Sequence, residues 1–142
     1  MNCIFCDIRD DKRSSYKVYE DKYTLAFLDN KPIEDGHVLL IPKEHKQYIE
    51  ELSELEAKEL MNTLFKILPP IKRAMKAKDC NIIINNGPNA GQIIPHVHIH
   101  IIPRSKKSSS SLFNGISRVK PRDEEYFRDI VQKIKKEIKT TT

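Results

Sequence analysis

The feature that most constrains the fold is the stretch His96-Val-His-Ile-His-Ile-Ile102, in which histidines alternate with apolar residues. Successive side chains of a β-strand point to opposite faces of the sheet. A register shift of one residue would bury the imidazoles in the core, so the apolar face determines the orientation of the strand. The pattern predicts a row of imidazoles spanning about 13 Å, from a rise of about 3.3 Å per residue. One face is expected to carry His96, His98 and His100, and the opposite face Val97, Ile99 and Ile101.

Three roles are open to such a row of imidazoles. Three surface histidines without function are one alternative, which the strict alternation disfavours. A three-histidine metal site is a second, but its ligand nitrogens must converge to about 2 Å from one zinc ion. A straight strand spreads its side chains, so two histidines could share a metal but hardly three. Catalysis is the third role, because a neutral imidazole is nucleophilic near pH 7 and a neighbour can stabilise a phosphoryl transition state.

Four further segments predict strands. Residues 17–20 and 24–28 are rich in β-forming side chains and are separated by a turn-forming segment. Residues 37–42 follow a loop that contains proline and glycine, and residues 81–85 precede a glycine-containing loop. Strands on both sides of one long helical region predict an α+β domain with an antiparallel sheet rather than alternating βαβ units.

Two helices are expected. Ser53 followed by Glu56 is a capping-box signature, and the apolar residues after it recur at helical spacing, namely Leu60, Met61, Leu64 and Leu68. Pro69-Pro70 is predicted to kink or interrupt this helix, because each proline removes an amide donor and crowds the preceding turn. A last helix is predicted over residues 124–138, where one face is apolar.

Length and composition indicate one ordinary globular domain of 142 residues, with 39% hydrophobic and 32% charged residues. No apolar run approaches the roughly 20 residues of a membrane span, and the N-terminus does not have the pattern of a signal peptide. Three cysteines, an odd number, argue against a disulfide scaffold. We therefore expect a cytoplasmic protein with no membrane partner.

The net charge of +5 is concentrated near the C-terminus. Residues 1–102 contain 14 Lys or Arg and 15 Asp or Glu, whereas residues 103–142 contain 11 and 5. This surplus either attracts phosphate-rich ligands or nucleic acid or forms an ordinary solvated surface. Residues 105–111 are predicted to be a linker. Residues 105–142 are thus expected to form a basic linker and a C-terminal helix that packs on the catalytic domain of residues 1–104.

The histidine strand resembles the histidine triad motif of the HIT family, His-φ-His-φ-His-φ-φ with φ apolar, and matches it at every position. Flanking segments are similar to the family as well: Asn85-Asn86-Gly87, Gly91-Gln92, Ile102-Pro103-Arg104, and upstream residues 4–8, 26–29 and 36–42. The similarity runs in order from about residue 2 to residue 104. The resemblance implies a HIT-like fold and a hydrolase that cleaves nucleoside phosphoramidates or dinucleoside polyphosphates through a nucleotidyl-histidine intermediate.

The resemblance also implies roles for individual residues. His98 matches the nucleophile that attacks the α-phosphorus, and His100 the residue that hydrogen-bonds the α-phosphate or the leaving atom. Asp29 matches the position that holds the ribose hydroxyls, and a purine nucleotide is the expected substrate. Phosphate contacts are expected from His37, Asn85 and Gln92. The base pocket is expected to be lined by Ile4, Phe5, Ile8, Phe27 and Leu28.

A structural zinc site is implied by the resemblance too. Cys3 and Cys6 have the C-x-x-C spacing that chelates a tetrahedral metal, and similar family members complete the site at the positions of His45 and His96. His96 would then be a metal ligand outside the chemistry. The alternative, a redox C-x-x-C, requires a βαβ context that this N-terminus lacks.

Two points stay open at the level of sequence. Several phosphoramidases of the family have serine after the Gly-Gln pair, whereas this chain has Ile93. The preference between amine and phosphate leaving groups is therefore not determined. Competing functions are a nucleotidyltransferase or phosphorylase, and a nucleotide-binding regulator or nucleic-acid-interacting protein that uses the basic C-terminal segment. Family members are commonly homodimers, and the apolar helix face is compatible with that arrangement.

Overall fold

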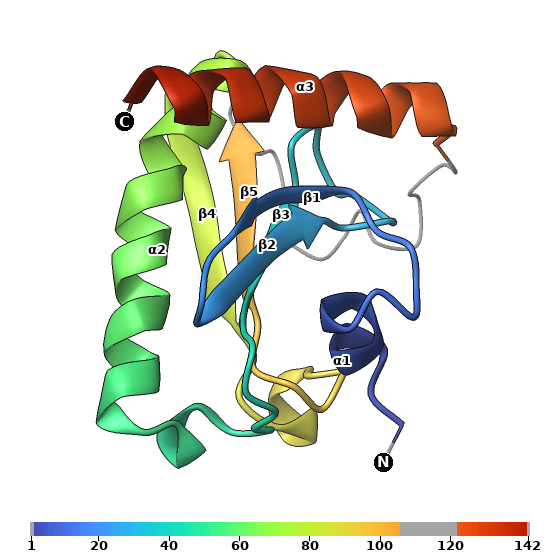
Figure 1. Ribbon diagram of the computed structural model, residues 1–142. Helices are drawn as coiled ribbons and strands as arrows, with labels where there is room; N and C mark the ends of the chain where they lie inside the picture. The colour runs from blue at the N-terminus through green and yellow to red at the C-terminus, as the bar shows by residue number, and fades with distance from the viewer. Residues whose placement is uncertain (1, 106–121, 142) are drawn as a thin grey trace.

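The computed structural model describes residues 2–105 and 122–141 (Figure 1). Five strands form one sheet in the order β1-β2-β3-β5-β4, with every neighbouring pair antiparallel. The predicted α+β class with an antiparallel sheet is confirmed. The strands are β1 (Lys17–Glu20), β2 (Thr24–Leu28), β3 (Val38–Pro42), β4 (Asp79–Ile84) and β5 (Ile99–Arg104). The helices are α1 (Ile4–Arg9), α2 (Glu54–Ala74) and α3 (Glu124–Thr141), with short 3₁₀ turns η1 (Ile49–Glu51) and η2 (Pro88–Ala90).

The histidine strand begins later than predicted. Its ladder starts at Ile99, so His96 and His98 lie in the extended segment that leads into β5. The reason lies in the backbone partners, because the N–H of Val97 donates to the carbonyl of Lys46 at 2.8 Å instead of to a strand. The expected alternation nevertheless holds for the apolar side, since Val97, Ile99 and Ile101 are all buried in one core cluster.

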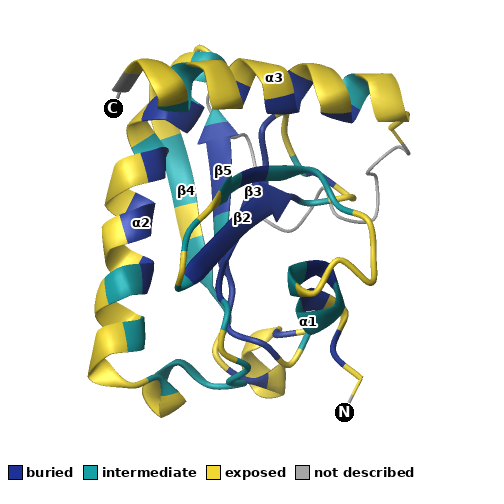
Figure 2. Ribbon diagram, viewed as in Figure 1, coloured by how far each residue is buried: buried dark blue, intermediate teal, exposed yellow. Residues whose placement is uncertain are grey.

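The sheet separates two hydrophobic clusters. The larger cluster lies on the side of α2 and α3, and the smaller lies on the side of α1 (Figures 1 and 2). Strands β2 and β3 contact both, so every one of their residues is buried. Alternation assigns Ala26, Leu28, Val38 and Leu40 to the larger cluster and Leu25, Phe27, Leu39 and Ile41 to the smaller. The smaller cluster is the face toward which the catalytic histidines were predicted to point.

Helix α2 begins with the predicted capping box. The Ser53 side chain accepts from the Glu56 N–H at 3.0 Å, and the Glu56 carboxylate accepts from the Ser53 N–H at 2.7 Å. Of the kink or interruption predicted at Pro69 and Pro70, the interruption does not occur, because the helix continues to Ala74. The carbonyls that lose their N–H partners belong to residues 65 and 66, which are both exposed, so water can satisfy them.

The C-terminal helix packs on the same domain. Tyr16 stacks on Phe127 with ring centroids 4.8 Å apart, and Arg73 of α2 pairs with Glu137 at 3.0 Å. The predicted helix over 124–138 is confirmed and extends to Thr141. The predicted linker lies outside the described residues apart from Ser105. Within the described residues, no helix is both long and apolar enough to cross a membrane.

The buried face of β5 should dominate stability. We expect Ile101→Ala to lower the free energy of unfolding by about 2–5 kcal/mol, because Ile101 has no exposed surface and truncation leaves a cavity. The matched control is Ile93→Ala in a loop, where the side chain is 86% exposed and the change should stay within about 0.5 kcal/mol. Urea unfolding of both variants measures the difference, and equal losses would contradict this assignment of the core.

Candidate active site

His98 and His100 lie side by side on the α1 side of the sheet. Their ring centroids are 5.0 Å apart, and the edge of Phe5 in α1 packs against His98 at 5.1 Å. His98 is 6% exposed and His100 is half-buried. Because the opposite face of this segment is held in the larger cluster, the two imidazoles are fixed in position rather than free on a surface.

The ring of His98 has a defined tautomer. Burial lowers the pKa of His98, with the hydrogen bond to the His96 carbonyl opposing this shift, so the ring is neutral near pH 7. Its Nδ1 lies 2.7 Å from the carbonyl oxygen of His96. A carbonyl can only accept, so Nδ1 bears the proton and Nε2 keeps its lone pair. No described residue hydrogen-bonds Nε2, so its lone pair is available to a ligand.

His37 is buried against His100. Its Nδ1 accepts from the Ile33 N–H at 3.1 Å, and its Nε2 lies 3.0 Å from Nδ1 of His100. His37 is only 2% exposed, and these two contacts occupy both ring nitrogens. Neither nitrogen is therefore free for a phosphate in this arrangement, although the sequence analysis expected such a contact.

Asp29 follows β2 and lies next to His37. Its Oδ2 is 3.5 Å from Nε2 of His37, and its Oδ1 accepts from the Lys31 N–H at 2.9 Å. Burial raises the pKa of Asp29, while the hydrogen bond from Lys31 opposes the shift. The side chain is 18% exposed, so part of it remains accessible to solvent.

The two amides predicted to contact phosphate differ in their surroundings. Gln92 is buried: its Oε1 accepts from the Gly87 N–H at 2.8 Å and its Nε2 donates to the Gln47 carbonyl at 2.9 Å. Gln92 therefore shapes the loop before β5. Asn85 is half-buried, and its side chain has no hydrogen-bond partner among the described residues, so its side-chain amide is available to a ligand.

The residues predicted to form the base pocket separate into two groups. Phe5, Ile8 and Phe27 belong to the smaller cluster on the histidine side, where the rings of Phe5 and Phe27 meet edge-on at 5.4 Å. Ile4 is 39% exposed at the start of α1. Leu28 lies in the larger cluster instead, because adjacent residues of a strand point to opposite faces. It therefore does not share the pocket with the others.

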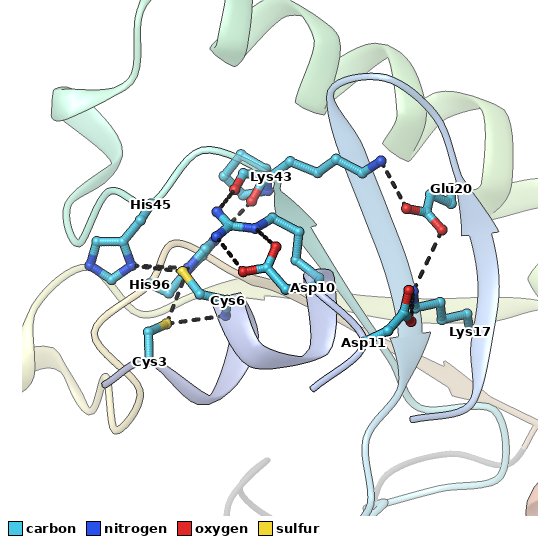
Figure 3. A network of polar contacts seen from close by, with 11 residues as sticks. Cys3, Cys6, Asp10, Asp11, Lys17, Glu20, Lys43, His45 and His96 are labelled. Carbon is cyan, nitrogen blue, oxygen red and sulfur yellow. Dashed lines mark hydrogen bonds and ion pairs between the residues drawn. The ribbon is translucent and has the colours of Figure 1, made fainter. Parts of the chain in front are cut away.

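Four predicted metal ligands converge beside the active site (Figure 3). The Sγ atoms of Cys3 and Cys6 and the ring nitrogens of His45 and His96 all lie within 4.8 Å of one another. His96 Nδ1 lies 3.4 Å from Cys3 Sγ, 3.7 Å from Cys6 Sγ and 3.3 Å from His45 Nδ1. A tetrahedral zinc ion requires about 3.3 Å between two nitrogens and about 3.6 Å between nitrogen and sulfur. The four donor atoms fit such an ion.

His96 connects this cluster to the nucleophile. Its Nε2 lies 2.8 Å from the Pro42 carbonyl, so the proton is on Nε2 and the Nδ1 lone pair faces the cysteines. Burial is the main cause that lowers the pKa of His96, to about 4, so the ring is neutral. The backbone carbonyl of the same residue accepts from His98 Nδ1. One residue thus directs a ring lone pair toward the two cysteines and orients His98 through its backbone.

Sequence reasoning did not identify which residues supply the backbone groups that orient the rings of the site. The carbonyls of Pro42 and His96 and the amide of Ile33 determine which ring nitrogens carry protons. Backbone groups have no signature in residue type, so no sequence signal could have identified them. The contact of His37 with His100 was also missed, since the two residues are 63 positions apart and meet only through the β3–β5 pairing.

Comparison with known proteins finds close relatives of this arrangement. The HIT domain family model matches residues 11–107. An adenosine 5′-monophosphoramidase of Schizosaccharomyces pombe is 41% identical over 107 residues, which cover 73% of this chain and 75% of that protein. A hypothetical histidine triad nucleotide-binding protein from Sulfolobus tokodaii superposes with a TM-score of 0.87 at 34% identity, covering 97% of this chain and 93% of the other.

A second solved structure, a Zn-bound histidine triad family protein from Mycobacterium smegmatis, superposes with a TM-score of 0.84 at 25% identity and covers 99% of this chain and 96% of that one. The family match includes His37, His98 and His100, and the structural matches extend over nearly the whole chain. Sequence, fold and geometry therefore agree. The chain belongs to the HIT (histidine triad) family.

Proposed function

We propose that the protein is a nucleotide hydrolase that cleaves the α-phosphate bond of nucleoside phosphoramidates or dinucleoside polyphosphates and releases a nucleoside monophosphate. The observation that carries this proposal is the hydrogen bond from His98 Nδ1 to the His96 carbonyl, which leaves Nε2 unprotonated in a neutral ring. Relatives named adenosine 5′-monophosphoramidase support the same class of reaction.

The reaction runs in two steps. Nε2 of His98 attacks the α-phosphorus, the phosphorus–nitrogen or phosphorus–oxygen bond to the leaving group breaks, and the leaving group takes up a proton from solvent. The nucleotide is then bound to His98 Nε2. Water attacks the same phosphorus and loses a proton to solvent, the bond to Nε2 breaks with its electron pair returning to the ring, and the monophosphate leaves. His100 and Asn85 are the neighbouring donors that would stabilise charge on the phosphate oxygens, and Asp29 would hold the ribose hydroxyls.

Purine nucleoside phosphoramidates are the substrate class that the relatives favour, since two of them are named for adenosine 5′-monophosphoramidate cleavage. Phe5 and Phe27 offer aromatic surface on the histidine side of the sheet, where a base can pack. The exposed side chain of Ile93 cannot donate a hydrogen bond to the leaving group, so His100 is the neighbouring side chain that would hydrogen-bond the leaving atom.

The nucleophile is tested with His98→Ala. We expect this change to lower AMP release from adenosine 5′-phosphoramidate by at least about 10³-fold, because alanine removes the proposed nucleophile. Acid-quenched wild-type protein should show an AMP adduct mapped to His98 by mass spectrometry. Cys80→Ala, a substitution outside the site, is the control for handling and folding.

Each outcome decides between functions. AMP release that persists in His98→Ala would exclude the proposed intermediate. Wild-type protein that binds AMP without releasing it from any substrate would favour the nucleotide-binding regulator. A nucleotidyl-His98 adduct that phosphate cleaves faster than water does would favour the phosphorylase.

We propose that Cys3, Cys6, His45 and His96 hold a structural zinc ion. The support is the tetrahedral spacing of the four donor atoms and the Zn-bound state of the Mycobacterium smegmatis relative. Four protein ligands leave no open position on a tetrahedral ion, so the metal would take no part in the chemistry. It would instead tie α1, and with it Phe5, to the segment that carries His98.

Metal analysis tests this site. Purified protein should contain about one zinc ion per chain, and Cys6→Ser should lose most of it, while Cys80→Ser keeps it. Removal of zinc by a chelator should lower the free energy of unfolding by about 3 kcal/mol, which is about 10 °C in Tm for a domain of this size. Zinc content that is the same in both variants would refute the assignment.

We also propose that the protein forms a homodimer through β4 and α2. β4 is an edge strand of the sheet, and Ile82 in it is 45% exposed. Its neighbour in the ladder, Ile101, faces the α2 side, so Ile82 points to that side as well. On α2, Met61 is 41% and Phe65 is 72% exposed. An open strand edge flanked by apolar side chains is a surface that proteins normally cover.

The dimer is tested by Phe65→Glu combined with Ile82→Lys. Burying these charges in an interface is unfavourable, so the double variant should be a monomer in light scattering at concentrations where the wild type is a dimer. Ile93→Glu introduces a similar charge at an exposed loop position and should leave the dimer intact. A wild-type protein that is still monomeric at a concentration of about 100 μM would contradict the proposal.

A further inference from the structure

Four cationic side chains surround a shallow hollow at the C-terminal end of α2. The hollow has a volume of about 580 Å³, and four of the seven described residues that line it are Lys72, Arg73, Lys76 and Lys78. The other three are uncharged. We propose that this hollow, which we call the α2 basic hollow, binds the phosphate backbone of double-stranded nucleic acid without reading its sequence. This binding is a function separate from the proposed hydrolase activity and does not depend on it.

The charge of the α2 basic hollow is local and largely uncompensated. Residues 72–78 contain four Lys or Arg and no Asp or Glu, although residues 1–102 as a whole contain 14 and 15. Lys72, Lys76 and Lys78 form no ion pair with a described residue, whereas Arg73 pairs with Glu137 of α3 at 3.0 Å. Like charges that share one hollow repel one another, so an anion bound among them would lower that repulsion.

Stabilisation of the helix dipole is the alternative explanation for these cations. Cations in the last turn of a helix interact favourably with its C-terminal carbonyls, but this effect falls off beyond that turn. It accounts for Lys72 and Arg73, which lie in the last turn of α2. Lys76 and Lys78 lie beyond Ala74, the last helical residue. The dipole therefore leaves two of the four cations unexplained.

Lys76 occupies a backbone position that favours glycine. Its φ is +52°, in the left-handed region. The N–H of the next residue, Ala77, donates to the Lys72 carbonyl at 2.8 Å, which is the closing hydrogen bond of a Schellman motif. Glycine is the usual residue at this position of the motif, because it has no Cβ to oppose a positive φ. Local backbone preference therefore does not explain why a lysine lies at the rim of the hollow.

The chemistry of the lining selects a duplex phosphate backbone among polyanions. Three of the four cations are lysines, which contact phosphates as point charges and carry no base-reading geometry of their own. None of the described lining residues is aromatic, so the hollow offers no surface on which an unpaired base would stack. Because the surface is concave, a projecting ridge of duplex phosphates fits it better than a flat membrane does.

The α2 basic hollow lies away from the candidate active site. The buried face of α2 packs in the larger cluster, whereas the histidines of the active site lie on the α1 side of the sheet (Figure 1). Lys76 also lines a neighbouring hollow, which contains one further lysine but three carboxylates, those of Glu34, Asp35 and Asp129. These carboxylates would repel a polyanion, so they limit the binding surface on that side.

Salt-dependent binding tests the proposal. A fluorescein-labelled DNA duplex of about 20 base pairs is titrated with the full chain between about 50 and 200 mM KCl, and polarisation gives Kd at each salt concentration. We expect the wild type to bind, with log Kd rising linearly with log salt concentration. The triple variant Lys72→Gln, Lys76→Gln and Lys78→Gln should bind at least about 10-fold more weakly at the lowest salt. Its slope should fall by about 2 to 3, because each phosphate contact contributes about 0.9.

The matched control is Lys12→Gln, Lys22→Gln and Lys58→Gln, which removes the same charge from exposed positions outside the hollow. We expect it to change Kd by less than about 2-fold and the slope by less than about 0.5. Equal losses in the two triple variants would reveal a general effect of net charge and would overturn the site. If the first triple variant does not fold, Lys78→Glu repeats the test outside the helix and should weaken binding by at least about 3-fold.

Competitors identify what binds and where. Millimolar AMP should leave the duplex bound, because a nucleotide is expected on the other side of the sheet, and displacement by AMP would place the duplex at the active site instead. Inorganic polyphosphate that displaces the duplex at a lower phosphate concentration than unlabelled duplex would overturn the nucleic-acid assignment. Tighter binding to phosphatidylserine vesicles through the same lysines would overturn it as well. A wild type that does not bind the duplex at the lowest salt would refute the proposal, whatever its AMP release.

Discussion

The burial of one face of a single extended segment determines the geometry of the site. Val97, Ile99 and Ile101 lie in the larger core cluster, and each would cost about 1–5 kcal/mol to remove from it. Rotating the segment to its other face would expose these three residues and bury imidazoles among aliphatic groups. His98 and His100 are therefore oriented by the hydrophobic burial of the three residues that alternate with them. Their position does not depend on a ligand.

Backbone groups then determine which ring nitrogen of each buried imidazole carries the proton. A net hydrogen bond is worth about 1 kcal/mol, which favours one tautomer about five-fold over the other. Burial adds to this preference, because an unpaired donor or acceptor costs more in the interior than in water. The His96 carbonyl favours the Nδ1–H form of His98, and the Ile33 amide favours the Nε2–H form of His37. The fold thus gives different tautomers to side chains of the same residue type.

His96 links the metal-ligand cluster to the nucleophile. Its ring lies between Cys3, Cys6 and His45, and its carbonyl holds His98. A change in the cluster would therefore reach the orientation of the nucleophile through one residue. On the other side of the site, the loop that contacts His37 is bonded to β5 and α3. The N-terminal α1 region and the C-terminal helix thus each contact a segment that borders His98 and His100.

The sequence by itself determined the elements and the residue types of the site. Alternating histidines, the capping box at Ser53 and the C-x-x-C spacing are local patterns, and local sterics and burial are enough to interpret them. Only the tertiary structure decided the later start of β5, the separation of Leu28 from the pocket, and the internal bonding of Gln92 and His37. These features depend on hydrogen-bond partners and packing surfaces that are distant in sequence, and on backbone donors and acceptors that every residue type shares. Tautomers and burial are therefore properties of the folded chain, because they are decided by which groups meet.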